Sequence, residues 1–353
     1  MTDSTTRGTP LRLGTRRSKL AVAQSGQVAD AVRELTGRPV ELVEITTYGD
    51  TSREQLARIG GTGVFVSALR DALLAGEIDF AVHSLKDLPT AQPDDLTLAA
   101  VPRREDPRDA LIARDGLAFE ELPDGARVGT GSPRRMAQLN AWARQLGRRI
   151  EAVPIRGNVD TRIAFVEKGE LDGVVLAAAG LTRIGRIDEA TQLLSPDMVL
   201  PAPGQGALAV ECAAVNADLA AELAGLDDPF TRAAVTAERS LLAALEAGCS
   251  APVGALADLS PSSRLRSSRG GPNPSSRLRS SRGGPMADEQ AVTEMRLRGV
   301  VGTTDGSALV QLSTTGHVPA SPDDTTTPLR MGRELAAEML AKGAAGLMGE
   351  RAL

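Results

Sequence analysis

The alternation of short apolar runs with amphipathic stretches is the feature that most restricts the fold of this chain. Residues 11–14, 40–47 and 78–82 are short and apolar, as buried strands are. Amphipathic segments of helical periodicity lie between them, and Ser18 is placed to cap the first, which extends to Gly37. Strands that alternate with helices in this way predict a mostly parallel, doubly wound α/β sheet.

The polar stretch 103–108 breaks this pattern and looks like a first crossing between domains. A second series of the same kind follows it, with Ser132 and Asn158 placed as helix N-caps. The proline- and glycine-rich stretch 200–206 looks like a second crossing between domains. Beyond about residue 227, strand patterns follow a long helix without strict alternation, which predicts a smaller α+β domain. Its predicted elements are helices at 229–247 and 329–348 and strands at 253–259, 292–301 and 309–314.

Composition excludes several functional classes. A formal net charge of −5 gives no general attraction to nucleic acid or membrane, and one Trp, one Tyr and five Phe are too few for a base-stacking surface. No run is long and apolar enough to span a bilayer, and residues 1–10 lack the apolar core of a signal peptide, so we expect a soluble cytoplasmic protein. Phosphate-loop, dinucleotide and serine-elbow motifs are missing, and His83 and His317 show no metal-ligand spacing.

An exact repeat interrupts the third part, because residues 262–272 recur as residues 275–285. The segment from about 260 to 287 is rich in Arg, Ser, Gly and Pro and too polar to be buried, which predicts a disordered loop. A tandem expansion tolerated at a hairpin tip is the preferred interpretation. A nucleic-acid-binding or partner-binding arm is the alternative, although no aromatic residues lie between its arginines.

The apolar run 78–82 ends in the polar sequence HSLKDLP at residues 83–89. Pro89 stops any regular continuation, which places Lys86 and Asp87 at or just past the carboxyl end of a strand. Ligands bind at that edge of open α/β sheets. A surface ion pair in an ordinary loop is the alternative.

Six arginines fall at predicted strand ends or first helical turns, and such places gather on one side of a doubly wound sheet. Helix N-termini and arginine forks both bind carboxylates and phosphates, so the pattern predicts a cleft for a polyanion. Ordinary solvated arginines at helix ends are the alternative. The six are Arg16, Arg134, Arg135, Arg156, Arg162 and Arg183, the last in a stretch, 181–183, that is expected to begin a helix or turn.

The two cysteines differ in context. Cys249 lies in a loop flanked by glycine and proline after the long helix, where it can serve as a nucleophile or an attachment point. Cys212, at the end of an apolar strand pattern, is expected to be a small core residue. Two cysteines form neither a disulfide framework nor a zinc site.

Several of these motifs together resemble the porphobilinogen deaminase (hydroxymethylbilane synthase) family. The similarity rests on HSLKDLP at 83–89, RGNVDTR at 156–162, LPAPGQG at 200–206 and EAGC at 246–249, in that order, with TRRS at 15–18 and SPRR at 132–135. It covers residues 11–353 apart from the repeat. One departure is that Thr62 and Ser67 stand around the glycine loop where many relatives carry lysines, although Arg58 keeps a positive charge nearby.

The resemblance implies three domains, the first two like periplasmic anion-binding proteins. Their expected extents are residues 10–102 with 203–226, residues 103–202, and residues 227–353. The resemblance also implies a dipyrromethane cofactor joined through a thioether to Cys249, onto which four porphobilinogen molecules are polymerised with loss of ammonia. Water then releases the linear tetrapyrrole hydroxymethylbilane. A cytoplasmic monomer without nucleic-acid or membrane partners is expected.

The resemblance assigns roles to single residues as well. Asp87 matches the catalytic aspartate, which would face a pyrrole N–H and stabilise the positive charge that develops as ammonia leaves. It would be the one carboxylate in a cationic cleft. The positions that match cofactor- or substrate-binding residues are Arg16, Ser18, Lys86, Thr130, Ser132, Arg134, Arg135, Arg156, Arg162, Arg183 and Gln205. A non-enzymatic anion-binding module of the same architecture, such as a solute-binding protein, is the alternative function.

Overall fold

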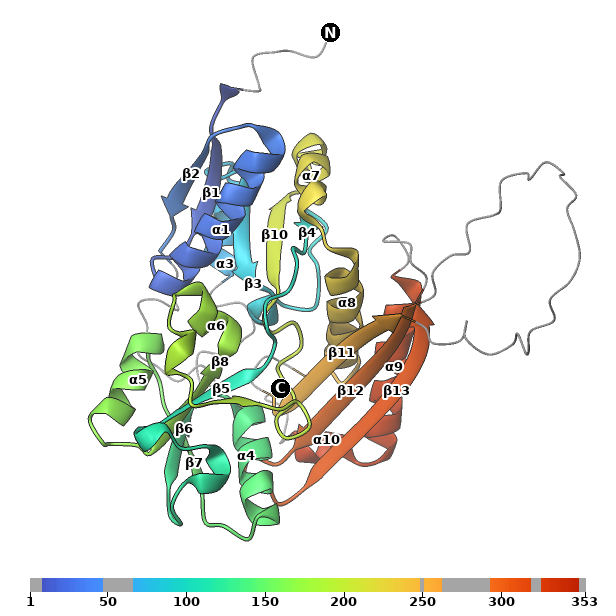
Figure 1. Cartoon of the computed structure of the whole chain (residues 1–353). Coiled ribbons are helices and arrows are strands. Elements are labelled where there is room, and N and C mark those ends of the chain that lie inside the picture. The colour runs from blue at the N-terminus through green and yellow to red at the C-terminus, as the bar shows by residue number, and fades with distance from the viewer. Residues whose placement is uncertain (1–7, 47–65, 248–250, 262–292, 319–324, 349–353) are drawn as a thin grey trace, which may run out of the picture.

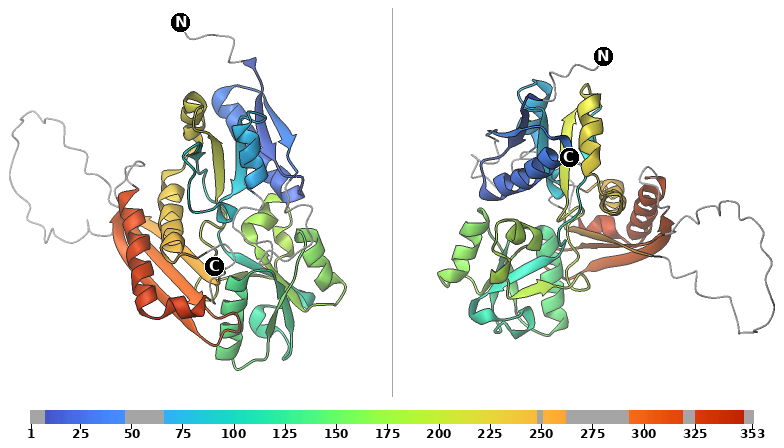
Figure 2. Two further views of the ribbon diagram at one scale, coloured as in Figure 1. Left: turned by 180° about the vertical axis from the view of Figure 1, so that it is seen from behind. Right: turned by 45° about the horizontal axis from the view of Figure 1, so that its top comes forward.

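The computed structural model describes residues 8–46, 66–247, 251–261, 293–318 and 325–348. Of the features singled out in the sequence, Arg58, Thr62, Cys249 and residues 262–287 of the repeat segment lie outside these ranges. The described strands form three sheets. Figures 1 and 2 show two α/β parts, one above the other, with a third part against the flank of both. Among the described helices, none combines the length and apolar character needed to cross a membrane.

The first sheet has the strand order β2-β1-β3-β10-β4. Its strands are β1 (Leu11–Thr15), β2 (Val40–Glu44), β3 (Phe80–Ser84), β4 (Leu96–Ala100) and β10 (Leu208–Ala213). Strand β1 is parallel to β2 and β3, whereas β10 is antiparallel to both of its neighbours, β3 and β4. Four strands therefore share one direction, which confirms the predicted mostly parallel sheet, and the reversed strand comes from far along the chain.

Helices cover both faces of the first sheet. They are α1 (Lys19–Thr36), α3 (Ser67–Leu74) and α7 (Ala217–Leu223). Because successive residues of a strand point to opposite faces, Phe80 and Val82 pack with residues of α1 and α7, whereas Ala81 packs with residues of α3. The sheet is thus doubly wound, as the alternation of strand and helix patterns predicted.

The second sheet, ordered β7-β6-β8-β5-β9, repeats this arrangement. Its elements are β5 (Asp109–Ala113), β6 (Arg127–Thr130), α4 (Pro133–Gln145), β7 (Glu151–Pro154), α5 (Val159–Glu167), β8 (Gly173–Ala177), α6 (Ala178–Arg183) and β9 (Gln192–Leu194). Here β5 is the reversed strand, antiparallel to β8 and β9. In each sheet the reversed strand is the one that follows a crossing, since the chain passes from β4 to β5 and returns from β9 to β10.

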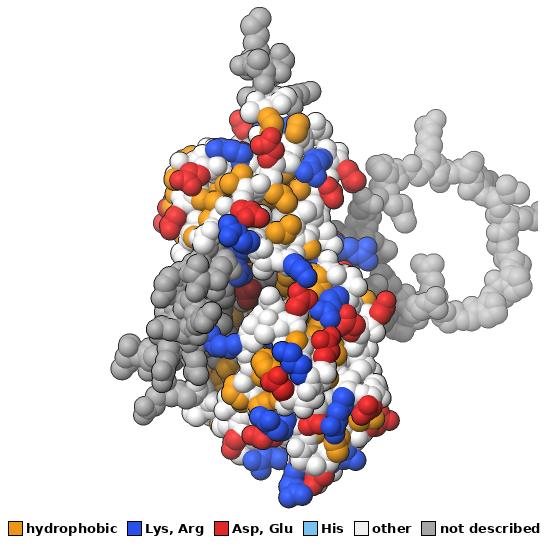
Figure 3. Space-filling model, turned by 90° about the vertical axis from the view of Figure 1, so that its left-hand side faces the viewer, with side chains coloured by type: hydrophobic (Ala, Val, Ile, Leu, Met, Phe, Trp, Pro, Cys, Tyr) orange, Lys and Arg blue, Asp and Glu red, His pale blue; other side chains and the backbone are white. Residues whose placement is uncertain are grey.

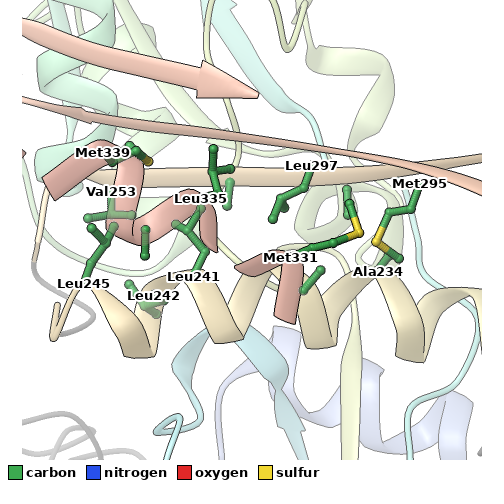
Figure 4. Close-up of a cluster of buried hydrophobic side chains, with 14 of the residues drawn as sticks. Ala234, Leu241, Leu242, Leu245, Val253, Met295, Leu297, Met331, Leu335 and Met339 are labelled. Carbon is green, nitrogen blue, oxygen red and sulfur yellow. The ribbon is translucent and has the colours of Figure 1, made fainter. Parts of the chain in front are cut away.

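The third part packs two long helices on one face of an antiparallel sheet, which confirms the predicted smaller α+β part. Its elements are α8 (Pro229–Ala244), β11 (Val253–Pro261), β12 (Thr293–Gly302), β13 (Leu309–Val318), α9 (Thr326–Ala341) and α10 (Ala344–Leu347). Figure 4 shows Leu241 and Leu245 of α8 meeting Leu335 and Met339 of α9, with Leu297 of β12 above them. This core fixes α8 to the third sheet.

Several element boundaries differ from the predictions, and two of these differences have a clear structural cause. Strand β3 extends to Ser84 rather than ending at Val82, because antiparallel pairing with β10 reaches that residue. The single helix predicted at 329–348 is broken after Ala341, where Gly343 adopts a left-handed φ of 89° before α10 begins. Neither a distant strand partner nor a helix break at one glycine is visible in local apolar periodicity.

Candidate active site

The polar turn after β3 is a short 3-10 helix over residues 85–87. Residues three apart share a face in such a helix, and Leu85 and Leu88 are both buried in one apolar cluster. Lys86 and Asp87 are half-buried outside that face. The Leu85 N–H also donates to the Ala207 carbonyl at 3.0 Å, so the turn is fixed to the segment that leads into β10.

Lys86 lies where the two α/β parts meet. Burial lowers the pKa of Lys86 to about 8. The negative charges of Asp87 and Asp109 oppose this shift, and the positive charges of Arg135 and Arg134 add to it. Arg134 and Arg135 lie in the first turn of α4, and Asp109 begins β5, so these three belong to the second sheet. Charged side chains from both α/β parts are therefore close enough around Lys86 to affect its pKa.

Asp109 is a buried carboxylate that the sequence analysis missed. It lies 2.8 Å from Arg134 Nη2 and 2.7 Å from Arg135 Nη2, and it accepts a hydrogen bond from Gln205 Nε2 at 2.8 Å. Burial alone would raise its pKa, but the two guanidinium groups hold the pKa of Asp109 well below the usual range. The expectation that Asp87 is the one carboxylate here is therefore wrong. Arg134 and Arg135, both buried, are not solvated helix-end residues.

Two further arginines extend the cluster along the second sheet. Asn158 caps α5 as predicted, since its Oδ1 accepts a hydrogen bond from the Thr161 N–H at 2.9 Å. Arg162 follows in the first turn of α5. Burial and the charges of Arg135 and Arg156 lower the pKa of Arg162 to about 10. Positive charges held this close to one another favour an anion between them.

Hydroxyl groups and helix N-termini adjoin these arginines. Thr130 is buried at the end of β6, and its Oγ1 accepts a hydrogen bond from the Ser132 N–H at 3.2 Å. Ser132 occupies the N-cap position of α4 as predicted, but its side chain makes no capping hydrogen bond. In the first sheet, Ser18 does cap α1, accepting a hydrogen bond from the Ala21 N–H at 3.2 Å, and Arg16 is half-buried between β1 and α1. Uncapped N–H groups at the start of α4 are suited to an anion.

Arg183 and Gln205 contact the crossing segments between the two sheets. Arg183 is the last residue of α6, not part of a helix start as predicted, and its Nη2 donates to the Gly206 carbonyl at 2.6 Å. Burial lowers the pKa of Arg183, and the charge of Glu105 opposes the shift. Gln205 is buried and donates to the Pro107 carbonyl at 2.8 Å. Gln205 therefore joins the two crossings, whereas Arg183 joins α6 to the second crossing.

The cluster carries more positive than negative charge. Its five cations and two carboxylates are Lys86, Arg134, Arg135, Arg156, Arg162, Asp87 and Asp109. Figure 3 shows Lys and Arg side chains at the edges of a hollow between the two α/β parts. Within the described residues, the buried atoms Arg134 Nε and Gln205 Oε1 have no hydrogen-bond partner, which a bound ligand can supply. Such a site fits a ligand that bears several carboxylates.

The described residues include Cys212 but not Cys249. Cys212 is fully buried in β10, which confirms the predicted core position. Burial, reinforced by the charge of Glu211, raises the pKa of its thiol, so Cys212 is a poor nucleophile. Cys249 lies outside the described residues, shortly after α8.

Comparison with known proteins covers almost the whole chain. Residues 11–221 match the family model described as "Porphobilinogen deaminase, dipyromethane cofactor binding domain", and residues 232–266 match "Porphobilinogen deaminase, C-terminal domain". The chain is 75% identical to porphobilinogen deaminase 1 of Streptomyces avermitilis over 346 residues, which are 97% of this chain and 98% of that one. It is 52% identical to porphobilinogen deaminase of Thermobifida fusca over 347 residues, which are 98% of this chain and 97% of that one.

Among solved structures, a probable amino-acid ABC transporter extracellular-binding protein of Bacillus subtilis shares 10% identity, with a TM-score of 0.38 over 62% of this chain and 90% of that one. The family models match both α/β sheets and the start of the third part, which favours the enzyme over a solute-binding module. The chain belongs to the porphobilinogen deaminase family, whose members are transferases (hydroxymethylbilane synthases) with a dipyrromethane cofactor.

Proposed function

We propose that this chain polymerises four porphobilinogen molecules, with loss of ammonia, on a dipyrromethane cofactor attached to Cys249, and then releases hydroxymethylbilane by hydrolysis. The observation that carries the proposal is the group of five cations, Lys86 among them, that lies with Asp87 where side chains of two sheets meet. Each porphobilinogen unit bears an acetate and a propionate group. When bound, the cofactor supplies the primer to which the first pyrrole is joined.

The arginines and Lys86 would hold the carboxylates of the cofactor and of the growing chain. Arg156 and Arg162 lie near the start of α5. The charge of Arg135 lowers the pKa of both Arg162 and Lys86, so Arg135 is close to both side chains. Guanidinium forks bind carboxylates through paired hydrogen bonds, and partial burial strengthens them. Arg134 and Arg135 also neutralise Asp109, and Arg134 Nε is the buried donor of this pair that lacks a partner among the described residues and could bind a ligand.

Asp87 would carry the catalytic role. Its carboxylate can accept a pyrrole N–H and stabilise the positive charge that develops on porphobilinogen as ammonia leaves. It can also take part in moving the protons that are lost and gained. Its half-buried position beside Lys86, on a turn anchored by Leu85 and Leu88, supports this role.

The proposal includes a domain division and a cellular setting. Residues 10–102 with 203–226 would form domain 1, residues 103–202 domain 2 and residues 227–353 domain 3, and the membership of the three sheets supports this division. The enzyme would act as a cytoplasmic monomer, with porphobilinogen as its substrate and no nucleic-acid or membrane partner. Size-exclusion chromatography with light scattering tests the monomer, since a mass of twice 36.7 kDa would contradict it.

Intact mass spectrometry tests the cofactor and its attachment together. Protein purified from a host with a working tetrapyrrole pathway should carry a covalent adduct of two pyrrole units, and Cys249→Ser should lose both adduct and turnover. Cys212→Ser is the matched control, because Cys212 is buried in the first sheet and should leave the adduct in place. Folded wild-type protein without an adduct, or an adduct retained in Cys249→Ser, would contradict the proposal.

A further inference from the structure

Arg239 of α8 binds the backbone of the turn that presents Lys86 and Asp87. The turn is only three residues long, and its one internal backbone hydrogen bond runs from the Leu88 N–H to the Leu85 carbonyl. One guanidinium binds the backbone at both ends of it, with Nη1 at 2.8 Å from Leu88 O and 3.3 Å from Leu85 O, and Nη2 at 2.6 Å from Pro89 O. These three acceptors lie on either side of Asp87 in the chain.

Helix α8 is a firm support for this contact. Asp228 caps it, accepting a hydrogen bond from the Thr231 N–H at 2.7 Å. Its apolar side lies in the core of the third part, with Leu241 fully buried there, whereas Val235 joins the cluster that buries Leu85 and Leu88. The helix therefore belongs to the third part and touches the first. It also leads, within a few residues, to Cys249.

We propose that Arg239 is a positioning residue for the reaction. It fixes the backbone on both sides of Asp87 to helix α8, and so holds the Asp87 carboxylate in its position relative to the third part. This inference rests on the proposed role of Asp87. A displacement of about 1 Å at a reacting group can lower turnover by roughly a hundredfold, and the loss of three backbone hydrogen bonds allows such a displacement.

Kinetics of Arg239→Ala provide the first test. Turnover (kcat) should fall roughly 10- to 100-fold, whereas KM should change less, because Arg134, Arg135, Arg156 and Arg162 lie outside the turn and keep their places. Arg333→Ala is the matched control. Arg333 lines the same cavity from α9 but is exposed and has no hydrogen bond to the turn among the described residues. Its kcat should equal that of the wild type. A wild-type kcat in Arg239→Ala, or a loss confined to KM, overturns the inference.

Chemical rescue separates positioning from a general effect on folding. Arg239 lines a cavity of about 470 Å³ that opens to solvent, together with Leu85, Thr90 and Ser240. Truncation at residue 239 therefore leaves room for a free guanidinium ion beside the turn. Guanidinium chloride at low millimolar concentration should restore kcat of Arg239→Ala in a saturable way, whereas sodium chloride of equal ionic strength should not. Equal responses to the two salts overturn the inference.

A second variant covers the case in which Arg239→Ala does not fold. Arg239→Lys keeps the charge but loses the planar fork, so kcat should fall less than in the Ala variant while the melting temperature stays near that of the wild type. A wild-type kcat in Arg239→Lys would then overturn the inference. Asp87→Ala, assayed in parallel, distinguishes the two proposals. If this variant retains turnover, the proposed role of Asp87 is wrong. If it is inactive while the Arg239 variant is fully active, only the proposed role of Arg239 is overturned.

Discussion

At the scale of single residues, Asp109 reorganises the site that the sequence indicated. The helix start at Ser132 made Arg134 and Arg135 predictable as anion-binding candidates, because N-caps are local signals. Their internal partner was not predictable, since Asp109 precedes Arg135 by 26 residues and Gln205 follows Asp109 by 96. Asp109 therefore partly neutralises Arg134 and Arg135, and which cations remain available to a ligand depends on contacts that form only in the folded chain.

Replacing Asp109 with Asn should destabilise the protein, because two buried guanidinium groups would lose their carboxylate. We expect a loss of about 3–5 kcal/mol in the free energy of unfolding, measured by urea denaturation. Asp87→Asn, at a half-buried position on the turn, should unfold near the wild type yet lose turnover. Asp109→Asn with wild-type stability would show that the arginines do not depend on this carboxylate.

The contacts of Asp109 with Arg134 and Arg135 also predict that the stability of the protein depends on pH. The folded pKa of Asp109 is lowered, so its contribution is fully present above the unfolded pKa of about 4 and is lost as the pH falls toward the folded value. Urea midpoints measured between pH 6 and pH 3 should therefore fall more steeply for the wild type than for Asp109→Asn. Parallel slopes would contradict the assignment.

Lys86 should titrate near neutrality in protein without the cofactor, since burial lowers its pKa to about 8. It is charged and able to bind carboxylate below that pH and neutral above it. The chain has only four lysines, so acetylation can be followed peptide by peptide. In Cys249→Ser, labelling of Lys86 should reach half its maximal rate near pH 8. A midpoint near pH 10, as for an ordinary lysine, would contradict the predicted shift.

At the scale of elements, local patterns predicted most helices and strands, and tertiary partners set the rest. Ser18 and Asn158 fixed two helix starts through their side-chain hydrogen bonds. The end of β3 depended instead on β10, which no local pattern near residue 84 reveals. The second crossing shows the same limit, because its glycines lie against residues that are distant in the sequence.

Gly206 has a left-handed φ of 88°, and a Cβ there would lie 2.5 Å from the Glu105 carbonyl oxygen. The backbone cannot easily move aside, because the Gly206 carbonyl accepts a hydrogen bond from Arg183. Gly206→Ala should therefore cost about 2 kcal/mol or more. Gly185→Ala, at a φ of 70° with nothing within 4 Å, should cost about 1 kcal/mol. Equal losses in urea denaturation would show that the contact with Glu105 relaxes freely.

At the scale of the whole molecule, Glu238 of α8 joins all three parts. Its fully buried carboxylate forms an ion pair with Arg104 at 2.7 Å and accepts hydrogen bonds from the Gly204 N–H at 2.7 Å and the Ala257 N–H at 2.9 Å. These donors lie in the first crossing, the second crossing and β11. The three-part layout was predictable from the alternation of patterns, but this shared contact was not, because it depends on how the parts pack.

Glu238→Gln should weaken all three attachments at once, since the amide nitrogen would face donors in place of an acceptor. We expect a loss of about 3–5 kcal/mol, seen as a lower melting temperature in calorimetry. Glu334→Gln is the control, because Glu334 pairs with Arg330 on the exposed side of α9 and should change little. A melting curve of Glu238→Gln that overlays the wild type would contradict the shared role.

The reversed strand β10 has a consequence for synthesis on the ribosome. Strands β3 and β4 leave the ribosome early, yet the strand between them comes about a hundred residues later, which takes roughly 5–20 s at ordinary translation rates. Until then both strands keep an open edge, a position prone to wrong pairing. The second α/β part, whose strands are contiguous in the chain, can close first. Vectorial synthesis thus delivers the turn bearing Asp87 early, and the segment that secures it through Ala207 only after the neighbouring domain is complete.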